Sequence, residues 1–119
     1  MDAIDYHRNA LIADGDDPTE VEESVSLICQ IQDENLLKEA LANLELLANK
    51  LGWPRDKDYA ALLLQHAADS IDNKKVRAAI LGFALNRAMW CASAATAGGE
   101  GISRSRHVKE LEVMYLECA

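Results

Sequence analysis

One segment, from about residue 73 to residue 96, constrains the fold more than any other part of the chain. Its apolar side chains lie on most of the circumference of a helix, and they are Val76, Ile80, Leu81, Phe83, Ala84, Leu85, Met89 and Trp90. A helix that is apolar on nearly every side is stable only when other elements cover it. The segment therefore predicts a central, buried helix. Arg87 within it must find an acid partner or reach solvent, because an unpaired buried charge is costly.

The elements around this helix are expected to be helices too. Only 5% of the residues are aromatic, and the chain is rich in Ala and Leu, a composition that favours helices over strands. Most of the expected helices begin at a side chain that can accept hydrogen bonds from the first turn. These capping residues are Asp2, Asp17, Asp33, either Asp56 or Asp58, and either Ser103 or Ser105. Gly15 and Gly52 are expected to end the first and third helices.

Apolar residues at spacings of three and four indicate which face of each helix points inward. The clearest stripe, in the third helix, is Leu37, Leu41, Leu44, Ala48 and Leu51. In the first two helices the inward residues are Ile4, Leu11, Ile12, Val21, Val25, Ile28 and Cys29. In the fourth they are Tyr59, Leu62, Leu63, His66, Ala67, Ser70 and Ile71, and in the last Val108, Leu111, Met114, Tyr115 and Cys118. Gly82 is expected to let a neighbouring helix approach the central one closely.

Five to six helices joined by short connections pack most simply as an antiparallel bundle in which successive helices are neighbours. We therefore predict an all-α fold with one domain over residues 1–119 and a central apolar helix at about 73–96. A solenoid is the second architecture considered. It would pair the helices of residues 33 to 72 and of residues 73 to 118, but the apolar spacings of these two pairs do not superimpose.

Several features indicate a cytoplasmic protein. The first residues carry acids where a secretory signal needs bases, and the most apolar stretch, Val76 to Ala97, holds Arg87 near its middle, so neither export nor a membrane span is expected. The three cysteines, Cys29, Cys91 and Cys118, form no close pair and suit a reducing compartment. The three histidines are scattered, so we expect no metal site and no cofactor.

The distribution of charge is the feature most informative about function. The chain has a net charge of -8, and residues 1–58 hold 14 acids against 5 bases whereas residues 59–119 hold 6 acids against 7 bases. The segment from Met1 to Glu23 contains eight acids and a single base, Arg8. Such a density of carboxylates repels phosphates, so we expect no direct binding of nucleic acid.

We interpret this acidic region as a binding surface for a basic protein, because complementary charge speeds encounter and sets the register of a complex. The residues expected to contact the partner are Asp14, Asp16, Asp17, Glu20, Glu22 and Glu23. A basic partner with a positive cleft is often a nuclease, and an acidic domain can occlude such a cleft without any catalytic residue. In size, acidity and compactness the chain resembles small bacterial immunity proteins and phage-encoded inhibitors, which implies neutralisation of a toxin. The resemblance assigns no residue, and acids at a helix start also simply stabilise the helix dipole.

Two alternatives come from other functional classes. The stretch Gly98 to His107 joins a glycine loop to a helix start, which suits a small-molecule or anion-binding regulator or enzyme that uses Ser103, Arg104, Ser105, Arg106 and His107. The stretch lacks the ending of a phosphate-binding Walker loop, and no strand is expected before it. The second alternative is a homo-oligomeric scaffold, in which surplus Ala and Leu of the central helix lie at an interface between copies.

Overall fold

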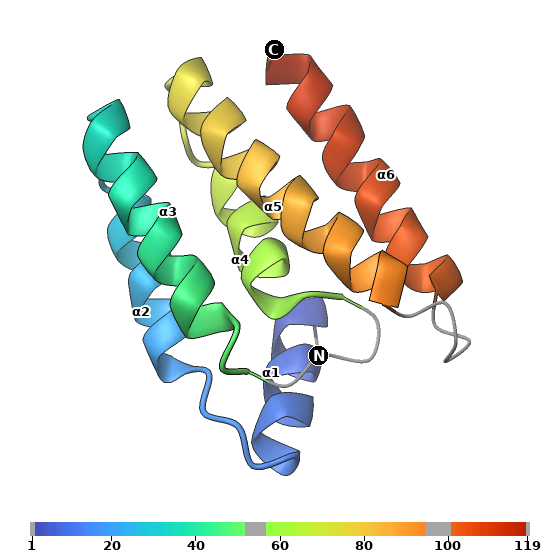
Figure 1. Ribbon diagram of the computed structural model, residues 1–119. Helices are drawn as coiled ribbons and strands as arrows, with labels where there is room; N and C mark the ends of the chain where they lie inside the picture. Colours follow the sequence, from blue (N-terminus) through green and yellow to red (C-terminus); the bar gives the residue numbers. More distant parts are fainter. Residues whose placement is uncertain (1, 52–56, 95–100, 119) are drawn as a thin grey trace.

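The computed structural model describes residues 2–51, 57–94 and 101–118, and these residues form six α-helices with no strand among them (Figure 1). The helices are α1 (Ala3–Ala13), α2 (Thr19–Ile28), α3 (Glu34–Ala48), α4 (Tyr59–Ala68), α5 (Lys74–Ala94) and α6 (Gly101–Cys118). The predicted all-α bundle is thus confirmed. None of the helices in the described ranges is long and apolar enough to cross a membrane.

Local hydrogen bonds explain where most of these helices begin. Asp2 accepts from the backbone N–H of Asp5, and Asp33 accepts from the N–H groups of the second and third residues after it. Asp58 caps α4 through the N–H of Ala61 at 2.9 Å. These caps were predicted, and Gly15, at φ +90°, follows α1 as expected. Two starts differ from the prediction. In α2, Pro18 occupies the cap position and Asp17, one residue before it, accepts the N–H of Thr19. The last helix, α6, already begins at Gly101.

Ser103 and Ser105 therefore lie inside α6 and do not cap it. The helix extends further toward the N-terminus than the serine signals indicated, since a serine also fits within a helical turn. The glycines before Gly101 and the predicted stop at Gly52 lie outside the described residues.

The middle four helices form two copies of one helix–turn–helix unit. α2 and α4 each have 10 residues. The offset along the chain from Thr19 to Tyr59, where these two helices begin, equals the offset from Glu34 to Lys74, where α3 and α5 begin. The turns match as well, because Ile31 donates its N–H to Ile28 and Ile71 donates its N–H to Ala68. The solenoid considered from the sequence paired residues 33 to 72 with residues 73 to 118. These bounds divide the chain at the two repeated turns instead of keeping each turn within a unit, so the repeat was missed.

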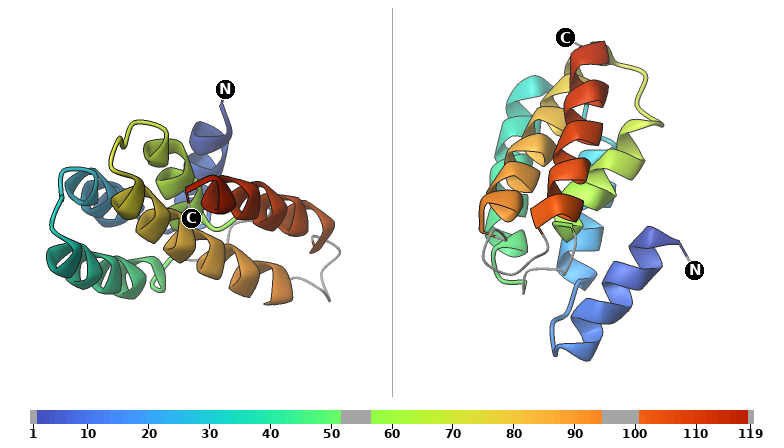
Figure 2. Two further views of the ribbon diagram at one scale, coloured as in Figure 1. Left: turned by 90° about the horizontal axis from the view of Figure 1, so that it is seen from above. Right: turned by 90° about the vertical axis from the view of Figure 1, so that its right-hand side faces the viewer.

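The helices form two layers (Figure 2, left). α2 and α4 lie in one layer, α3 and α5 lie in the other, and α6 runs along α5, with which it makes the largest of the helix contacts. α1 crosses one end of the bundle and packs chiefly on α4 (Figure 2, right). Successive helices are therefore neighbours from α2 onward, whereas α1 contacts a helix that is distant in sequence. Arg8 also ties α1 to α2 through Glu22.

The central position of α5 is confirmed, with one correction. Its buried residues are Val76, Ile80, Leu81, Ala84, Ala88 and Cys91. Met89 and Trp90, predicted to be buried, are 53% and 70% exposed. Cys91, one residue further along α5, is buried, so Met89 and Trp90 are exposed because of the side of the helix on which they lie. The close approach at Gly82 is confirmed, since a Cβ there would lie 3.2 Å from the ring of Tyr115 on α6.

The inward face of α4 also differs from the prediction. His66 and Ser70 are exposed, and the buried residues are Tyr59, Ala60, Ala61, Leu62, Leu64 and Ala68. Because α4 packs against α1, α2 and α5, a wide part of its surface is buried. Much of that surface consists of alanines, which were not predicted to be buried because the prediction relied mainly on large apolar residues. Ile12 and Cys29 are likewise exposed, while His7 is buried against the core.

Candidate functional site

The predicted partner-binding acids lie at the turn between α1 and α2 and along α2. Asp14, Asp17, Glu20 and Glu23 are exposed and Asp16 is half-buried. Asp17 accepts the backbone N–H of Thr19 at 3.0 Å, and hydrogen bonding from the Thr19 side chain, followed by this N–H, lowers the pKa of Asp17, so its carboxylate stays charged. These residues, together with Glu22, are called the acidic surface below.

Glu22 has a different environment from the other five acids. Its Oε2 forms an ion pair with Nε of Arg8 at 2.8 Å and accepts the hydroxyl proton of Tyr59 at 2.6 Å. Tyr59 is only 1% exposed, and burial together with the nearby Glu22 carboxylate raises the pKa of its hydroxyl. Glu22 thus joins α1, α2 and α4, so its charge is largely balanced within the protein.

A shallow groove of about 460 Å³ runs beside α2 and includes two of these acids. It is lined by Thr19, Glu22, Glu23, Ser26 and Leu27. Leu27 is 63% exposed, so an apolar side chain stands next to carboxylates on the same face. Leu27 was not predicted to be a contact residue, although its position away from the buried stripe of Val21, Val25 and Ile28 indicates that it is exposed.

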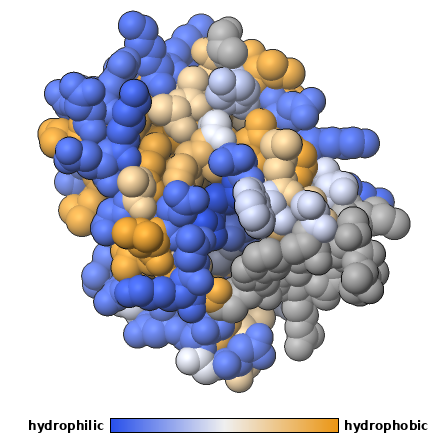
Figure 3. Space-filling view, viewed as in Figure 1, coloured by the Kyte–Doolittle hydropathy of each residue, from blue (hydrophilic) through white to orange (hydrophobic). Residues whose placement is uncertain are grey.

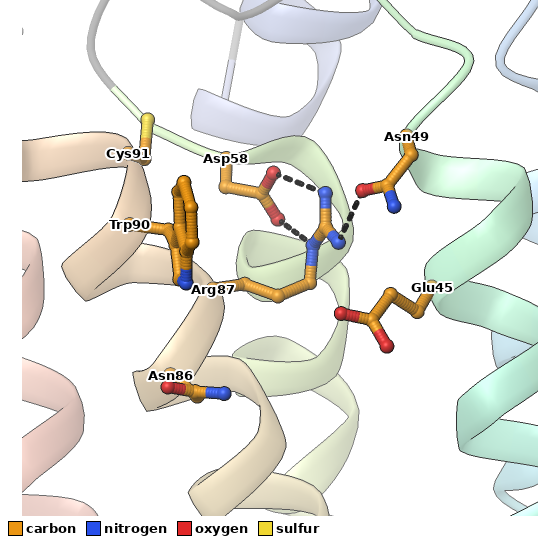
Figure 4. Close-up of a pocket in the computed structure, with 7 residues that line it drawn as sticks. All are labelled: Glu45, Asn49, Asp58, Asn86, Arg87, Trp90 and Cys91. Atoms are coloured by element: carbon orange, nitrogen blue, oxygen red, sulfur yellow. Dashed lines mark hydrogen bonds and ion pairs between the residues drawn. The ribbon is translucent and has the colours of Figure 1, made fainter. Parts of the chain in front are cut away.

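The second site is a cleft of about 380 Å³ between α3 and α5 (Figure 4). At its floor, the guanidinium of Arg87 binds both carboxylate oxygens of Asp58, with Nε–Oδ2 at 2.8 Å and Nη2–Oδ1 at 3.0 Å. Nη1 donates to Oδ1 of Asn49 at 3.0 Å. Of the two outcomes expected for Arg87, solvent or an acid partner, the structure has the acid partner, Asp58.

Two further side chains border this cleft on opposite sides of the Arg87 guanidinium in Figure 4. Glu45 of α3 presents its carboxylate on one side, and Trp90 of α5 presents its indole on the other. Asn86 and Cys91 complete the lining. These residues come from the end of α3, the residue before α4 and the later part of α5, so no single sequence motif connects them. The signal in the sequence was the lone Arg87 in an apolar helix.

The residues of the predicted anion site are not brought together on one described surface. Ser105 and Arg106 are exposed, whereas His107 is only 1% exposed and its Nε2 lies 2.7 Å from Oε1 of Gln65. Burial lowers the pKa of His107 to about 4, so its ring is neutral at pH 7. The side chains of Ser103 and Arg104 lie outside the described part of the chain. Anion binding by this segment stays a prediction.

The face of the molecule that contains the cleft is largely hydrophilic, with apolar residues in smaller patches (Figure 3). Within the described ranges, no three His, Cys, Asp or Glu side chains are grouped closely enough to hold a metal ion. Neither a protein-family model, nor a curated protein, nor a solved structure matches this chain.

Proposed function

We propose that this protein is a non-enzymatic, cytoplasmic protein-binding inhibitor of the immunity type, which occludes a basic partner such as a toxin or a nuclease through the acidic surface. The observation that carries the proposal concerns Arg8. It is the one base between Met1 and Glu23, and its guanidinium is held by Glu22. The exposed acids Asp14, Glu20 and Glu23 therefore keep an uncompensated negative field, which attracts and orients a basic partner.

The groove beside α2 supports the same proposal. Leu27 offers an apolar contact beside Glu22 and Glu23, and protein interfaces usually combine apolar contacts with a polar rim. Charge complementarity at the rim mainly raises the association rate, and burial of an anchor mainly slows dissociation. The described cysteines, Cys29, Cys91 and Cys118, form no disulfide with one another, which agrees with action in a reducing compartment.

The test compares two variants with the same loss of charge. One carries Asp14→Asn, Glu20→Gln and Glu23→Gln, and the control carries Asp72→Asn, Glu112→Gln and Glu117→Gln at exposed positions elsewhere. The tagged protein first captures its partner from the native host at low salt, and mass spectrometry identifies that partner. Association rates of the purified pair are then measured at several salt concentrations.

We expect the first variant to associate about tenfold more slowly and with a weaker dependence on salt, while the control stays near the unmodified protein. Equal rates for the two variants would exclude the acidic surface as the contact. A partner without basic character, or a captured enzyme whose activity is unaffected by the complex, would exclude occlusion as the function.

Self-association is a second candidate, because two adjacent helices, α5 and α6, each expose large apolar residues. They are Met89 and Trp90 of α5 and Val113 and Leu116 of α6, all more than half exposed. Apolar side chains of this size on neighbouring helices suit contact with a second copy. Sedimentation at increasing protein concentration tests this directly, and a constant monomer mass would exclude it.

A further inference from the structure

We propose that the cleft between α3 and α5 is a binding site for a guanidinium group, as presented by an arginine side chain of a basic partner. This proposal rests on the proposed function only for the identity of the molecule that carries the arginine.

The floor of the cleft does not attract an anion, although it contains a guanidinium. The two carboxylate oxygens of Asp58 neutralise Arg87, and both side chains are only 12% exposed. Asp58 Oδ2 also accepts the N–H of Ala61, so this carboxylate is held by three donors. The pair is a fixed, neutral floor, and it holds the adjoining wall of α5 in position against α4.

The charge left in the cleft is negative. Glu45 is exposed on α3, and the two ion pairs within the described ranges, Arg8–Glu22 and Arg87–Asp58, do not include it. With Asp58 and Arg87 cancelling each other, Glu45 is the uncompensated charge among the lining residues. A ligand that enters the cleft therefore gains by bringing a positive charge to this carboxylate.

Trp90 narrows the choice among cations. Its indole borders the cleft and is 70% exposed, so its ring is available to a ligand. A flat guanidinium can stack on an indole while its N–H groups form a two-point contact with a carboxylate, whereas an ammonium is a strongly hydrated point charge. The cleft volume of about 380 Å³ lies within the usual range for ligand sites. Together, Glu45 and Trp90 favour an arginine over a lysine.

The experiment uses small probes, so that it is independent of any partner. N-acetyl-arginine N-methylamide is titrated into the protein at low salt, with the citrulline derivative as a neutral analogue of nearly the same shape and the lysine derivative as the alternative cation. NMR follows the indole N–H of Trp90, assigned by its loss in Trp90→Phe, and the backbone amide of Asn86. We expect saturable shifts with the arginine probe and a Kd on the order of 1 mM.

Variants identify the groups responsible. Glu45→Gln should weaken binding about tenfold, and Trp90→Ala should weaken it about threefold as seen at Asn86. Glu39→Gln, which removes an exposed carboxylate of α3 that does not line the cleft, is the matched control and should bind unchanged. The mutated side chains are exposed, and far-UV circular dichroism confirms that each variant keeps its helices.

Three results would overturn the proposal: shifts that do not saturate, a citrulline probe that binds as well as arginine, or a Glu45→Gln variant that binds unchanged. Lysine binding equal to or tighter than arginine would overturn the guanidinium assignment. Failure of the acidic surface in the partner experiment leaves these titrations unaffected, and failure of the titrations leaves that experiment unaffected, so the two proposals are judged separately.

Discussion

Arg87 and Asp58 illustrate how a polar pair is accommodated inside an apolar region. Arg87 belongs to the most apolar helix of the chain, yet its three donor nitrogens contact Asp58 and Asn49 at 2.8–3.0 Å. Removing one member of a buried pair leaves the other without compensation, which costs more than removing both. The pair therefore specifies how the start of α4 meets α5, whatever its net contribution to stability.

Arg87→Met is expected to lower the free energy of unfolding by about 3 kcal/mol, because the Asp58 carboxylate loses its cation in a mostly buried position. The double variant Asp58→Asn with Arg87→Met should recover a large part of this loss, since the asparagine keeps the cap on Ala61 and carries no charge. Urea unfolding of the parent, the single variants Arg87→Met and Asp58→Asn, and the double variant measures both effects. Losses that simply add in the double variant would show that the two side chains are not coupled.

His107 predicts how stability depends on pH. Its pKa is about 4 in the folded protein because the ring is buried, compared with an ordinary value of about 6.5 in the unfolded chain. Between these two values the unfolded chain binds the extra proton, so stability should fall as the pH drops from about 6.5 to about 4, by up to about 3 kcal/mol.

His107→Gln removes this titration, and urea unfolding at several pH values in that window should show a shallower decline for the variant. The comparison between variant and parent matters, because carboxylates titrate near the lower end of the window in both proteins. A decline of equal slope in both would contradict the role assigned to His107.

At the scale of elements, the repeated unit is organised around its turn. Asp33 before α3 and Asn73 before α5 occupy equivalent positions, and each accepts the N–H groups of the second and third residues that follow. Helix α6 is outside the repeat, and it covers α5 closely because Gly82 has no side chain to hold Tyr115 away. Because the two caps are equivalent, we expect them to contribute similar free energies to the stability of the fold.

Asp33→Ala and Asn73→Ala should each reduce the free energy of unfolding by about 1 kcal/mol, since each leaves N–H groups of a first helical turn without a side-chain acceptor. Gln32→Ala and Asp72→Ala are the controls. They change the exposed residues immediately before the two caps and should have little effect. Thermal unfolding of the four variants provides the comparison, and strongly unequal losses at the two caps would mean that the units do not contribute alike.

In the molecule as a whole, some helices are covered by several neighbouring helices and others by few. α5 packs against α3, α4 and α6, whereas α1 packs chiefly against α4. In an array whose units contact mainly their neighbours, terminal elements open at a lower free energy than those covered on several sides. The acidic half of the chain, residues 1–58, includes this weakly covered end, and its carboxylates repel one another.

Amide hydrogen exchange should therefore be slowest in α5 and fastest in α1 among the described helices. Exchange in α1 is expected to proceed by local opening, while the slowest amides of α5 follow global unfolding. Mass spectrometry of peptides from the two segments at several urea concentrations distinguishes these routes. Equal protection of α1 and α5 would indicate that the whole chain opens as one unit.

The amino-acid sequence was enough to predict which segments are helices and where most of them begin. Caps such as Asp2, Asp33 and Asp58 accept hydrogen bonds from N–H groups within three residues, so the interaction can be predicted from residues that are close in the sequence. The buried stripe of α3 and the central position of α5 could also be predicted, because helical periodicity and a nearly continuous apolar surface require burial. The concentration of acids in the first half is a property of the sequence alone.

The contacts between residues of different helices could not be predicted in this way and are known from the fold. The cleft joins Glu45 of α3, Asp58 before α4, and Arg87 and Trp90 of α5. The burial of His107 and the exposure of Trp90 likewise depend on which elements lie opposite each of them. Glu22 likewise looks like any other acid of α2 until Arg8 and Tyr59 approach it. Periodicity and capping depend on neighbours along the chain, whereas burial and ion pairing depend on neighbours in space, and these exist only after the helices have packed.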